Sequence, residues 1–407
     1  MAVPLPSSNT TINVSGTSGA GYALKFTTAF QSNGSASGAW ATNAQDVFNL
    51  TNADVILDAG WAAGGLMGGF TVNSTTGNTL TVNGNITNTG SRTTAGIVNS
   101  GTLTLNNTMS GAFTGTNYGF FVTLNGGTLN INNAGAIRNN SAISGTRAGL
   151  AIAGGTLNNT SGAAITLTYN PTVLLNGDFA FGTSGSTSTN SLNLGTGAAS
   201  LGPNTGTART ITVNGSATLT VGGVIATGTT ATALIKAGTG TLKLSGANTF
   251  TGGTTINAGT LTAANAAALG TGATTVSGGT LDLNGTSVQA VSGITNLTLS
   301  SGTIAFTLTS AASFDQISGS GAFTLSGGTI DLTSSVTNYA STYQILNFTS
   351  GGTVSGLSIV NYDTADYVAS VSTTGVLSFA AVPEPTTWTM LIGGLGMASL
   401  LRRRRTV

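Results

Sequence analysis

The sequence predicts an all-β protein in which parallel strands coil into a β-solenoid. Two observations lead to this fold class: apolar residues alternate with polar ones, and Gly-Thr-Leu segments recur at intervals of one coil. The 407 residues include 61 glycines and only 5% charged side chains, but 40% are hydrophobic. Regularly placed apolar residues in this proportion can supply a core, which favours a folded chain over a disordered one.

The alternation appears in short segments such as GTLTLNN, GTGTLKLSG and SGGTLDLNG, which start at residues 101, 238 and 277. A period of two places Leu103 and Leu105 on one face of a strand, while Thr104 points to the other face. Thr is frequent because β-branched side chains suit a pleated surface. The same pattern predicts that Leu242, Leu244, Leu281 and Leu283 point inward and that Lys243 and Asp282 point outward.

The spacing of these segments predicts stacked coils. The Thr of Gly-Thr-Leu or Gly-Thr-Ile recurs in two groups, 102–156 and 241–329, with steps of about 19 to 28 residues within each group, which falls in the range of repeat architectures. A coil of this length has room for several strands of four or five residues joined by tight turns. The threonines are Thr102, Thr128, Thr156, Thr241, Thr260, Thr280, Thr303 and Thr329.

Asn-Gly pairs end many of the apolar runs and indicate turns, because both residue types tolerate a positive φ. Asn-Gly is also a hairpin signal, so an antiparallel β-sandwich or meander is the alternative fold. Coil-length spacing favours the solenoid, and so does the scarcity of Pro in the body, where only Pro171 and Pro203 occur between residues 7 and 382. The Asn-Gly pairs begin at Asn83, Asn125, Asn176, Asn214 and Asn284.

We expect four regions. Residues 1–60 are less repetitive and form an N-terminal cap or irregular β region, 61–235 form a β-solenoid, 236–381 continue the β-solenoid with closer repeats, and 382–407 form a separate tail. The first residues, MAVPLPSSNTTINVSGTSG, contain neither a basic segment nor an apolar one, so no secretory signal peptide is seen there.

The stretch from Lys236 to Gly285 resembles the autotransporter-associated β-strand repeat found in passenger domains of Gram-negative bacteria. The resemblance rests on GTL at 240–242, SGANTFTG at 245–252, TINAGTL at 255–261 and ALG at 268–270. It implies a right-handed parallel β-helix on an exported chain.

The tail resembles a PEP-CTERM sorting signal. Pro383-Glu384-Pro385 precedes an apolar segment, residues 386–401, and the basic cluster Arg402, Arg403, Arg404 and Arg405 follows. As a transmembrane helix the 16 apolar residues would span about 24 Å, somewhat less than the hydrocarbon core of a bilayer. The arginines would stay cytoplasmic and stop transfer.

The resemblance implies further properties of this tail. An exosortase removes it near Pro383–Pro385, after it has served as a transient inner-membrane anchor. The body is then released to the cell surface or the extracellular space. The resemblance also implies a bacterium that makes an exopolysaccharide or a similar extracellular matrix.

The sequence offers little for catalysis. It contains no His and no Cys, so we expect no Ser-His-Asp arrangement, no cysteine nucleophile, no zinc site and no cofactor. Paired carboxylates can hydrolyse glycosides, which leaves a polysaccharide lyase or glycoside hydrolase as an alternative function. The candidate acids are Asp54 with Asp58, Asp363 with Asp366, and Asp282 with Asp331. The simpler interpretation is that these Asp residues are solvated or cap turns.

Charge and polarity decide the expected partners. Without Arg402–Arg405 the chain has seven basic residues, because 11 − 4 = 7, and it lacks the basic stripe that nucleic acid binding requires. Thr-x-Thr units could form outward ladders, but ordinary β-propensity is enough to explain why these threonines occur. The Thr-x-Thr units begin at Thr79, Thr102, Thr210, Thr218 and Thr260.

We expect a non-catalytic, exported structural or adhesive protein that associates with a surface or with exopolysaccharide matrix; a cell adhesin is a further alternative.

Overall fold

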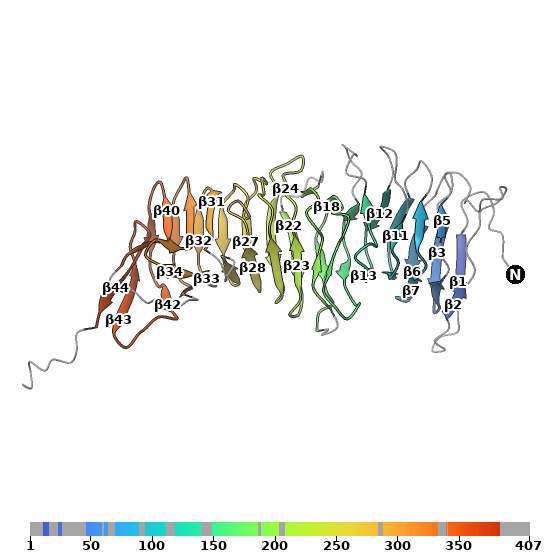
Figure 1. The fold of residues 1–407 in the computed structure, drawn as a ribbon, viewed down its shortest axis with the longest axis horizontal. Coiled ribbons are helices and arrows are strands. Elements are labelled where there is room, and N and C mark those ends of the chain that lie inside the picture. The colour runs from blue at the N-terminus through green and yellow to red at the C-terminus, as the bar shows by residue number, and fades with distance from the viewer. Residues whose placement is uncertain are drawn as a thin grey trace, which may run out of the picture.

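The computed structural model confirms the all-β fold class and the parallel solenoid. Its strands run across an elongated body, and the chain advances along the long axis from the N-terminal to the C-terminal end (Figure 1). The structure describes residues 11–15, 23–26, 46–58, 61–63, 70–88, 94–110, 119–139, 149–185, 189–202, 208–283, 288–332, 339 and 341–382.

The longest sheet, called here the long sheet, takes one strand from each successive coil. Its fourteen strands pair in parallel, and each neighbour is one coil further along the chain. This arrangement excludes the antiparallel sandwich as the main architecture. The strands are β2 (Ala23–Phe26), β4 (Asp54–Leu57), β7 (Thr79–Val82), β10 (Thr102–Leu105), β13 (Thr128–Ile131), β16 (Thr156–Asn158), β19 (Phe179–Phe181), β22 (Ala208–Val213), β25 (Ala233–Ala237), β27 (Thr254–Ile256), β29 (Thr274–Val276), β32 (Leu297–Leu299), β37 (Phe323–Leu325) and β41 (Gly352–Val354).

Two further parallel sheets cover one half of the solenoid each. The N-terminal sheet runs through β1 (Thr11–Ser15), β3 (Asp46–Thr51), β6 (Phe70–Ser74), β9 (Thr94–Val98), β12 (Gly119–Leu124), β15 (Leu150–Ile152), β18 (Val173–Leu175), β21 (Ala199–Ser200) and β24 (Ile225–Ala226), with β14 (Arg138–Asn139) antiparallel to β12. The C-terminal sheet runs through β17 (Ile165–Thr166), β20 (Leu192–Asn193), β23 (Thr218–Val221), β26 (Thr241–Leu244), β28 (Thr260–Ala263), β30 (Thr280–Asp282), β33 (Thr303–Phe306), β38 (Thr329–Leu332) and β42 (Ser358–Val360).

Shorter sheets complete the coils at either end. One contains β5 (Trp61–Ala63), β8 (Ile86–Asn88) and β11 (Met109–Ser110), and another contains β31 (Ala290–Ile294), β36 (Gln316–Gly319) and β40 (Leu346–Phe348). An antiparallel pair, β34 (Leu308–Ser310) and β35 (Ser313–Phe314), projects from the coil that follows β33.

The core is a set of inward rows that run along the solenoid. In the C-terminal sheet, Leu242 pairs in register with Leu261, which pairs with Leu281 and then with Ile304, and all four side chains are fully buried. Stacking identical or similar apolar residues in parallel register keeps each row continuous, so burial stabilises neighbouring coils together. The predicted inward positions Leu103, Leu105, Leu244 and Leu283 are also fully buried, which confirms the period-two assignment.

The described Asn-Gly pairs lie at coil corners, as predicted: each directly follows the end of β7, β12, β18 or β22, and Gly215 has a φ of +68°. Asn83, Asn125, Asn176 and Asn214 do not have a positive φ; among the described residues other than Gly, only Asn52, Asn170 and Asn361 do. The side chains of Asn83 and Asn125 donate hydrogen bonds to the preceding coil. A coil corner is thus held by the neighbouring coil as well as by its own backbone.

Glycine is required where stacked corners approach closely. Gly127 has a φ of +64°, and a Cβ on it would lie 2.3 Å from the backbone oxygen of Gly101 in the preceding coil. Gly155 repeats this arrangement against Gly127 one coil later, with a φ of +76°. A column of glycines therefore lets the corners stack at strand spacing.

The C-terminal end of the solenoid carries a small antiparallel sheet, called here the cap sheet. It consists of β39 (Tyr343–Gln344), β44 (Val376–Ala381) and β43 (Tyr367–Val371), with β44 in the centre. The sequence analysis placed residues 236–381 in the solenoid and did not predict this sheet. At the other end, β1 to β4 join the same sheets as later coils, while the predicted boundary at residue 60 stays a prediction.

Candidate functional site

A row of asparagines on the N-terminal sheet is joined by side-chain hydrogen bonds from coil to coil; we call it the first ladder. The amide of Asn49 donates to Asn13 at 2.8 Å, and Asn73 donates to Asn49 at 3.1 Å. Asn99 then donates to Asn73 at 3.1 Å and Asn125 to Asn99 at 2.9 Å. Each bond links residues that are neighbours only because two coils stack.

A second ladder follows the corner after the long sheet and ends on a carboxylate. Asn132 donates to Asn106 at 3.0 Å, Asn106 to Asn83 at 2.7 Å, and Asn83 to Asp58 at 2.7 Å. At its other end Asn132 accepts a hydrogen bond from the backbone N–H of Thr160 at 2.8 Å. The Asn132–Asn106, Asn106–Asn83 and Asn83–Asp58 bonds all run toward the N-terminus, so each polarises the next and Asp58 accepts at the negative end.

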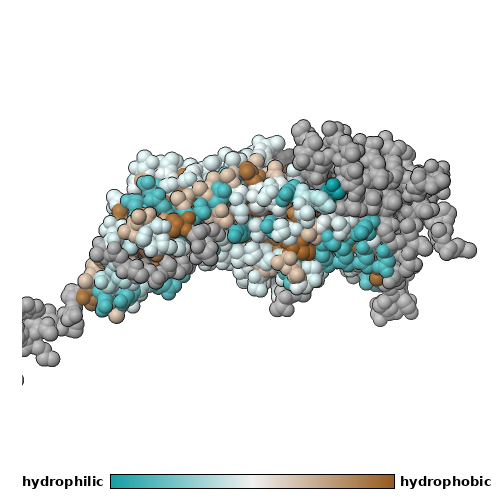
Figure 2. Space-filling model, in the orientation of Figure 1, coloured by the Kyte–Doolittle hydropathy of each residue, from teal (hydrophilic) through white to brown (hydrophobic). Residues whose placement is uncertain are grey.

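The two ladders present polar groups to solvent. Asn83, Asn99, Asn106, Asn125 and Thr160 are exposed. Figure 2 shows hydrophilic residues gathered on the visible face in the region of β13. The described part of the surface therefore includes rows of amides at the spacing of β-strands.

Threonine forms further outward columns in the C-terminal sheet. Thr241, Thr260, Thr280 and Thr303 pair in one register column of the C-terminal sheet, which continues to Thr329. Two of the Thr-x-Thr units, which begin at Thr79 and Thr102, also pair in register in the long sheet. Hydroxyl groups on such a column face outward beside the buried leucines, because side chains alternate along each strand.

The candidate carboxylates mostly hold coils or turns together. Asp54 accepts from the backbone N–H of Thr79 at 2.8 Å and from Asn78 at 3.2 Å, one coil further on. Asp363 accepts from the backbone N–H groups of Ala365 and Asp366 within its own turn. These contacts agree with the simpler interpretation, in which the Asp residues cap turns and strand ends.

Asp282 and Asp331 lie in one column of the C-terminal sheet, as predicted. Asp282 is paired with Ala305, which is paired with Asp331, so two strand spacings separate them. Asp282 accepts from the hydroxyl of Thr262 at 3.1 Å, and Asp331 accepts from Asn361 at 2.6 Å. The two acids share a face, and each is bonded to a polar side chain of an adjacent coil.

Asp315 is a fully buried carboxylate that the sequence analysis missed. It accepts from the backbone N–H of Thr307 at 2.6 Å and of Gln289 at 2.5 Å, which fixes the β34–β35 pair to the solenoid. Burial raises the pKa of Asp315, the backbone hydrogen bonds oppose this shift, and the charge of Asp282 adds to it. These hydrogen bonds offset part of the cost of burying the carboxylate.

Lys236 is a second buried charged residue that the sequence analysis did not identify. It occupies an inward position of β25 and is fully buried, and its Nζ donates to the backbone oxygens of Ala237, Gly238 and Ala258 at 2.7, 2.8 and 3.1 Å. Burial lowers the pKa of Lys236 to about 8. The ammonium group thereby ties one corner to the corner of the next coil.

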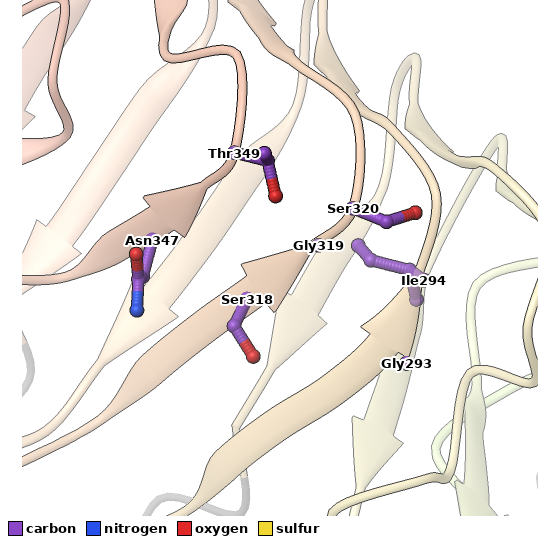
Figure 3. A pocket seen from close by; sticks show the side chains of 7 residues that line it. All are labelled: Gly293, Ile294, Ser318, Gly319, Ser320, Asn347 and Thr349. Carbon is purple, nitrogen blue, oxygen red and sulfur yellow. The ribbon is translucent and has the colours of Figure 1, made fainter.

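An open depression lies on the outside of the β31–β36–β40 sheet. Gly293, Ile294, Ser318, Gly319, Ser320, Asn347 and Thr349 line a volume of about 300 Å³ (Figure 3). Its polar lining is uncharged, and it sits where the register shifts between Val291 and Ile294. Within the described ranges, no cluster of three acidic side chains is arranged to hold a metal ion.

The predicted sorting residues lie outside the described residues. This applies to Pro383, Glu384, Pro385, the apolar segment 386–401 and Arg402–Arg405. No helix with the length and apolarity to cross a membrane occurs in the part of the chain that the structure describes.

The fold and its ladders define a class of protein, the parallel β-solenoids with polar outer rows. Comparison with protein families adds two matches. The passenger-associated-transport-repeat family matches residues 234–263 and 267–283, and the PEP-CTERM protein-sorting motif matches residues 381–405. No curated protein matches this chain. The chain therefore carries passenger-type repeats and an exosortase sorting motif, and it is an exported repeat protein.

Proposed function

We propose that this protein is a non-catalytic β-solenoid of the bacterial cell surface or extracellular matrix, where its polar rows bind polysaccharide. The observation that carries the proposal is the combination of an exosortase sorting motif with a solenoid whose ladders expose amides and hydroxyls. An exosortase would process the tail at Pro383–Pro385 after transient anchoring in the inner membrane.

The ladders suit a ligand with many hydroxyl groups. An asparagine amide has two N–H donors and an oxygen with two lone pairs, so a ladder bond leaves capacity for external partners. Each contact to a sugar would be weak, but rows at a fixed spacing let one chain make many contacts at once. The surface is nearly uncharged, which favours neutral polysaccharide over strongly anionic polymers.

Retention of the purified body on native matrix material tests this proposal. We expect the body to bind neutral exopolysaccharide and to lose binding when Asn83, Asn106 and Asn132 are all changed to Ala. Thr353→Ala, which changes an exposed residue of β41 outside both ladders, is the control and should keep full binding. Binding to whole cells stripped of polysaccharide would instead support a cell adhesin.

A polysaccharide-acting enzyme is the second candidate, because Asp282 and Asp331 share one column. Two strand spacings amount to about 9.5 Å between backbones, near the upper carboxylate separation in inverting glycosidases. Release of reducing ends from an exopolysaccharide by wild-type protein, with loss in Asp282→Asn, would establish this function. We expect no release from either protein.

A further inference from the structure

The cap sheet meets the sorting motif without a linker. The motif begins at residue 381, which is the last residue of β44 and pairs with Tyr367 of β43. The backbone N–H of Val382 donates to the backbone oxygen of Asp366 at 2.8 Å. The fold therefore holds the chain up to the residue before Pro383.

The last residues of β44, from Phe379 to Ala381, are held by pairing with β43, while only Val376 and Leu377 at its start pair with β39. In the cap sheet β44 is the central strand, so its backbone pairs with β39 and with β43. Phe379 packs its ring edge-to-face against Tyr339 with ring centroids 5.0 Å apart, and it also contacts Tyr362 at 5.7 Å. Withdrawing β44 would break its backbone pairing with β39 and with β43. It would also remove Phe379 from its ring contacts with Tyr339 and Tyr362.

A processing enzyme needs the chain in a different state. Enzymes that cut a peptide bond bind several residues on each side of it in an extended form, often by pairing with the backbone. For a bond within residues 383–385, the upstream residues are Phe379, Ala380, Ala381 and Val382, and the cap sheet occupies them. Cleavage adds an acceptor such as water across the C–N bond, and the released tail leaves as an amine.

We propose that the cap sheet gates processing of the sorting motif. The enzyme acts when β44 is released from the cap sheet, and the closed cap sheet protects the same bond. This inference rests on the proposed processing at Pro383–Pro385. Local opening of a terminal element needs less free energy than global unfolding, so the gate opens without loss of the solenoid.

An engineered crosslink tests the gate, because the hydroxyls of Ser370 and Ser378 lie 3.3 Å apart on paired positions of β43 and β44. Antiparallel partners have Cα separations suited to a disulfide, and the chain contains no other Cys. In the processing host, we expect Ser370→Cys with Ser378→Cys to lower the rate of tail removal about tenfold or more. The single variants should be processed like wild type.

A flexible insertion separates the gate from other effects of the crosslink. Eight Gly/Ser residues between Val382 and Pro383 should restore processing in the crosslinked chain, because the enzyme can then bind residues outside the cap sheet. Equal processing of wild-type and crosslinked chains would overturn the gate and leave the sorting role intact. Absence of processing in wild type and in the insertion variant would overturn the proposed processing itself.

Discussion

At the residue scale, Lys236 shows how one buried cation can serve a solenoid. Three backbone oxygens surround its ammonium group, so hydrogen bonds offset part of the cost of burying a charge. The other charged group nearby on a paired strand is Arg209 of β22, which is also buried and donates to the backbone oxygens of Leu175 and Ala208. Both cations face main-chain oxygens, which fixes the corners of successive coils.

The lowered pKa of Lys236 predicts that stability rises at alkaline pH. Its pKa is about 8 in the folded state and 10.5 as the reference value, so between these pH values the unfolded chain binds more protons. The contribution of Lys236 is least favourable below pH 8 and improves up to pH 10.5, by at most about 3 kcal/mol. The free energy of unfolding, measured with denaturant at pH 7.5 and at pH 10, should rise more for wild type than for Lys236→Met, because Met has no proton to lose.

If wild type and Lys236→Met change equally with pH, the titration of Lys236 does not contribute. The comparison is needed because other groups also titrate at alkaline pH, among them Tyr343, whose pKa is raised by burial. Taking the difference between the two proteins removes those contributions.

Leu242 tests the inward rows at the same scale. Leu242→Asp places a carboxylate at a fully buried position between Leu219 and Leu261, which should cost several kcal/mol and open at least the adjacent coils. Lys243→Asp changes the adjacent, outward residue and should shift stability by less than about 1 kcal/mol. Thermal unfolding with hydrogen exchange compares the two; an unchanged Leu242→Asp protein would show that this row is assigned wrongly.

At the element scale, the ladders decide how neighbouring coils align. A backbone ladder tolerates a shift by two residues, but side-chain amides bond only to the matching position of the next coil. The second ladder also ends on Asp58 at one side and on Thr160 at the other, so its direction is defined. Asparagine at these corners therefore specifies register in addition to exposing polar groups.

Breaking the second ladder in its middle should loosen several coils. Asn106→Ala removes the bonds to Asn83 and from Asn132, which should cost about 1–2 kcal/mol because the exposed partners regain water. Amide exchange should accelerate in β7, β10 and β13 ahead of the C-terminal coils. Asn347→Ala, at an exposed position of β40 outside both ladders, should leave these rates unchanged. Equal exchange in both variants would mean that the ladder carries no register information.

At the scale of the whole molecule, the chain runs from the solenoid through the cap sheet to the sorting motif. The tail places four arginines after an apolar segment, against seven basic residues in the rest of the chain, because 11 − 4 = 7. This charge contrast suits a stop-transfer anchor. The short apolar segment, which contains Gly393, Gly394 and Gly396, suits an anchor that is later removed.

Replacing Arg402–Arg405 by Ser should let the precursor pass through the inner membrane and escape processing. Glu384→Ala should leave the anchor intact and accumulate a membrane-bound, uncleaved precursor. Mass spectrometry of the mature C-terminus in the native host, with cell fractionation, distinguishes these outcomes. An intact Arg402–Val407 end on extracellular wild-type protein would contradict the sorting role of this tail.

The sequence by itself determined the strand content, the inward rows and the identity of the tail. Leu103, Leu242 and Leu281 could be assigned because alternation and coil spacing are local properties that need no knowledge of neighbouring coils. The motif at 381–405 was likewise readable from the order of its residues.

Only the tertiary structure decided which face some strands bury and which side chains link the corners of neighbouring coils. In β25 both alternating sets of residues are largely apolar, and pairing of Lys236 with Ile211 and Ile256 is what turns the lysine inward. A shift of one residue would reverse every side chain of that strand, so composition alone cannot choose. The ladders and the cap sheet also depend on contacts between residues 23 to 36 positions apart or on strand order, and these arise only when coils stack.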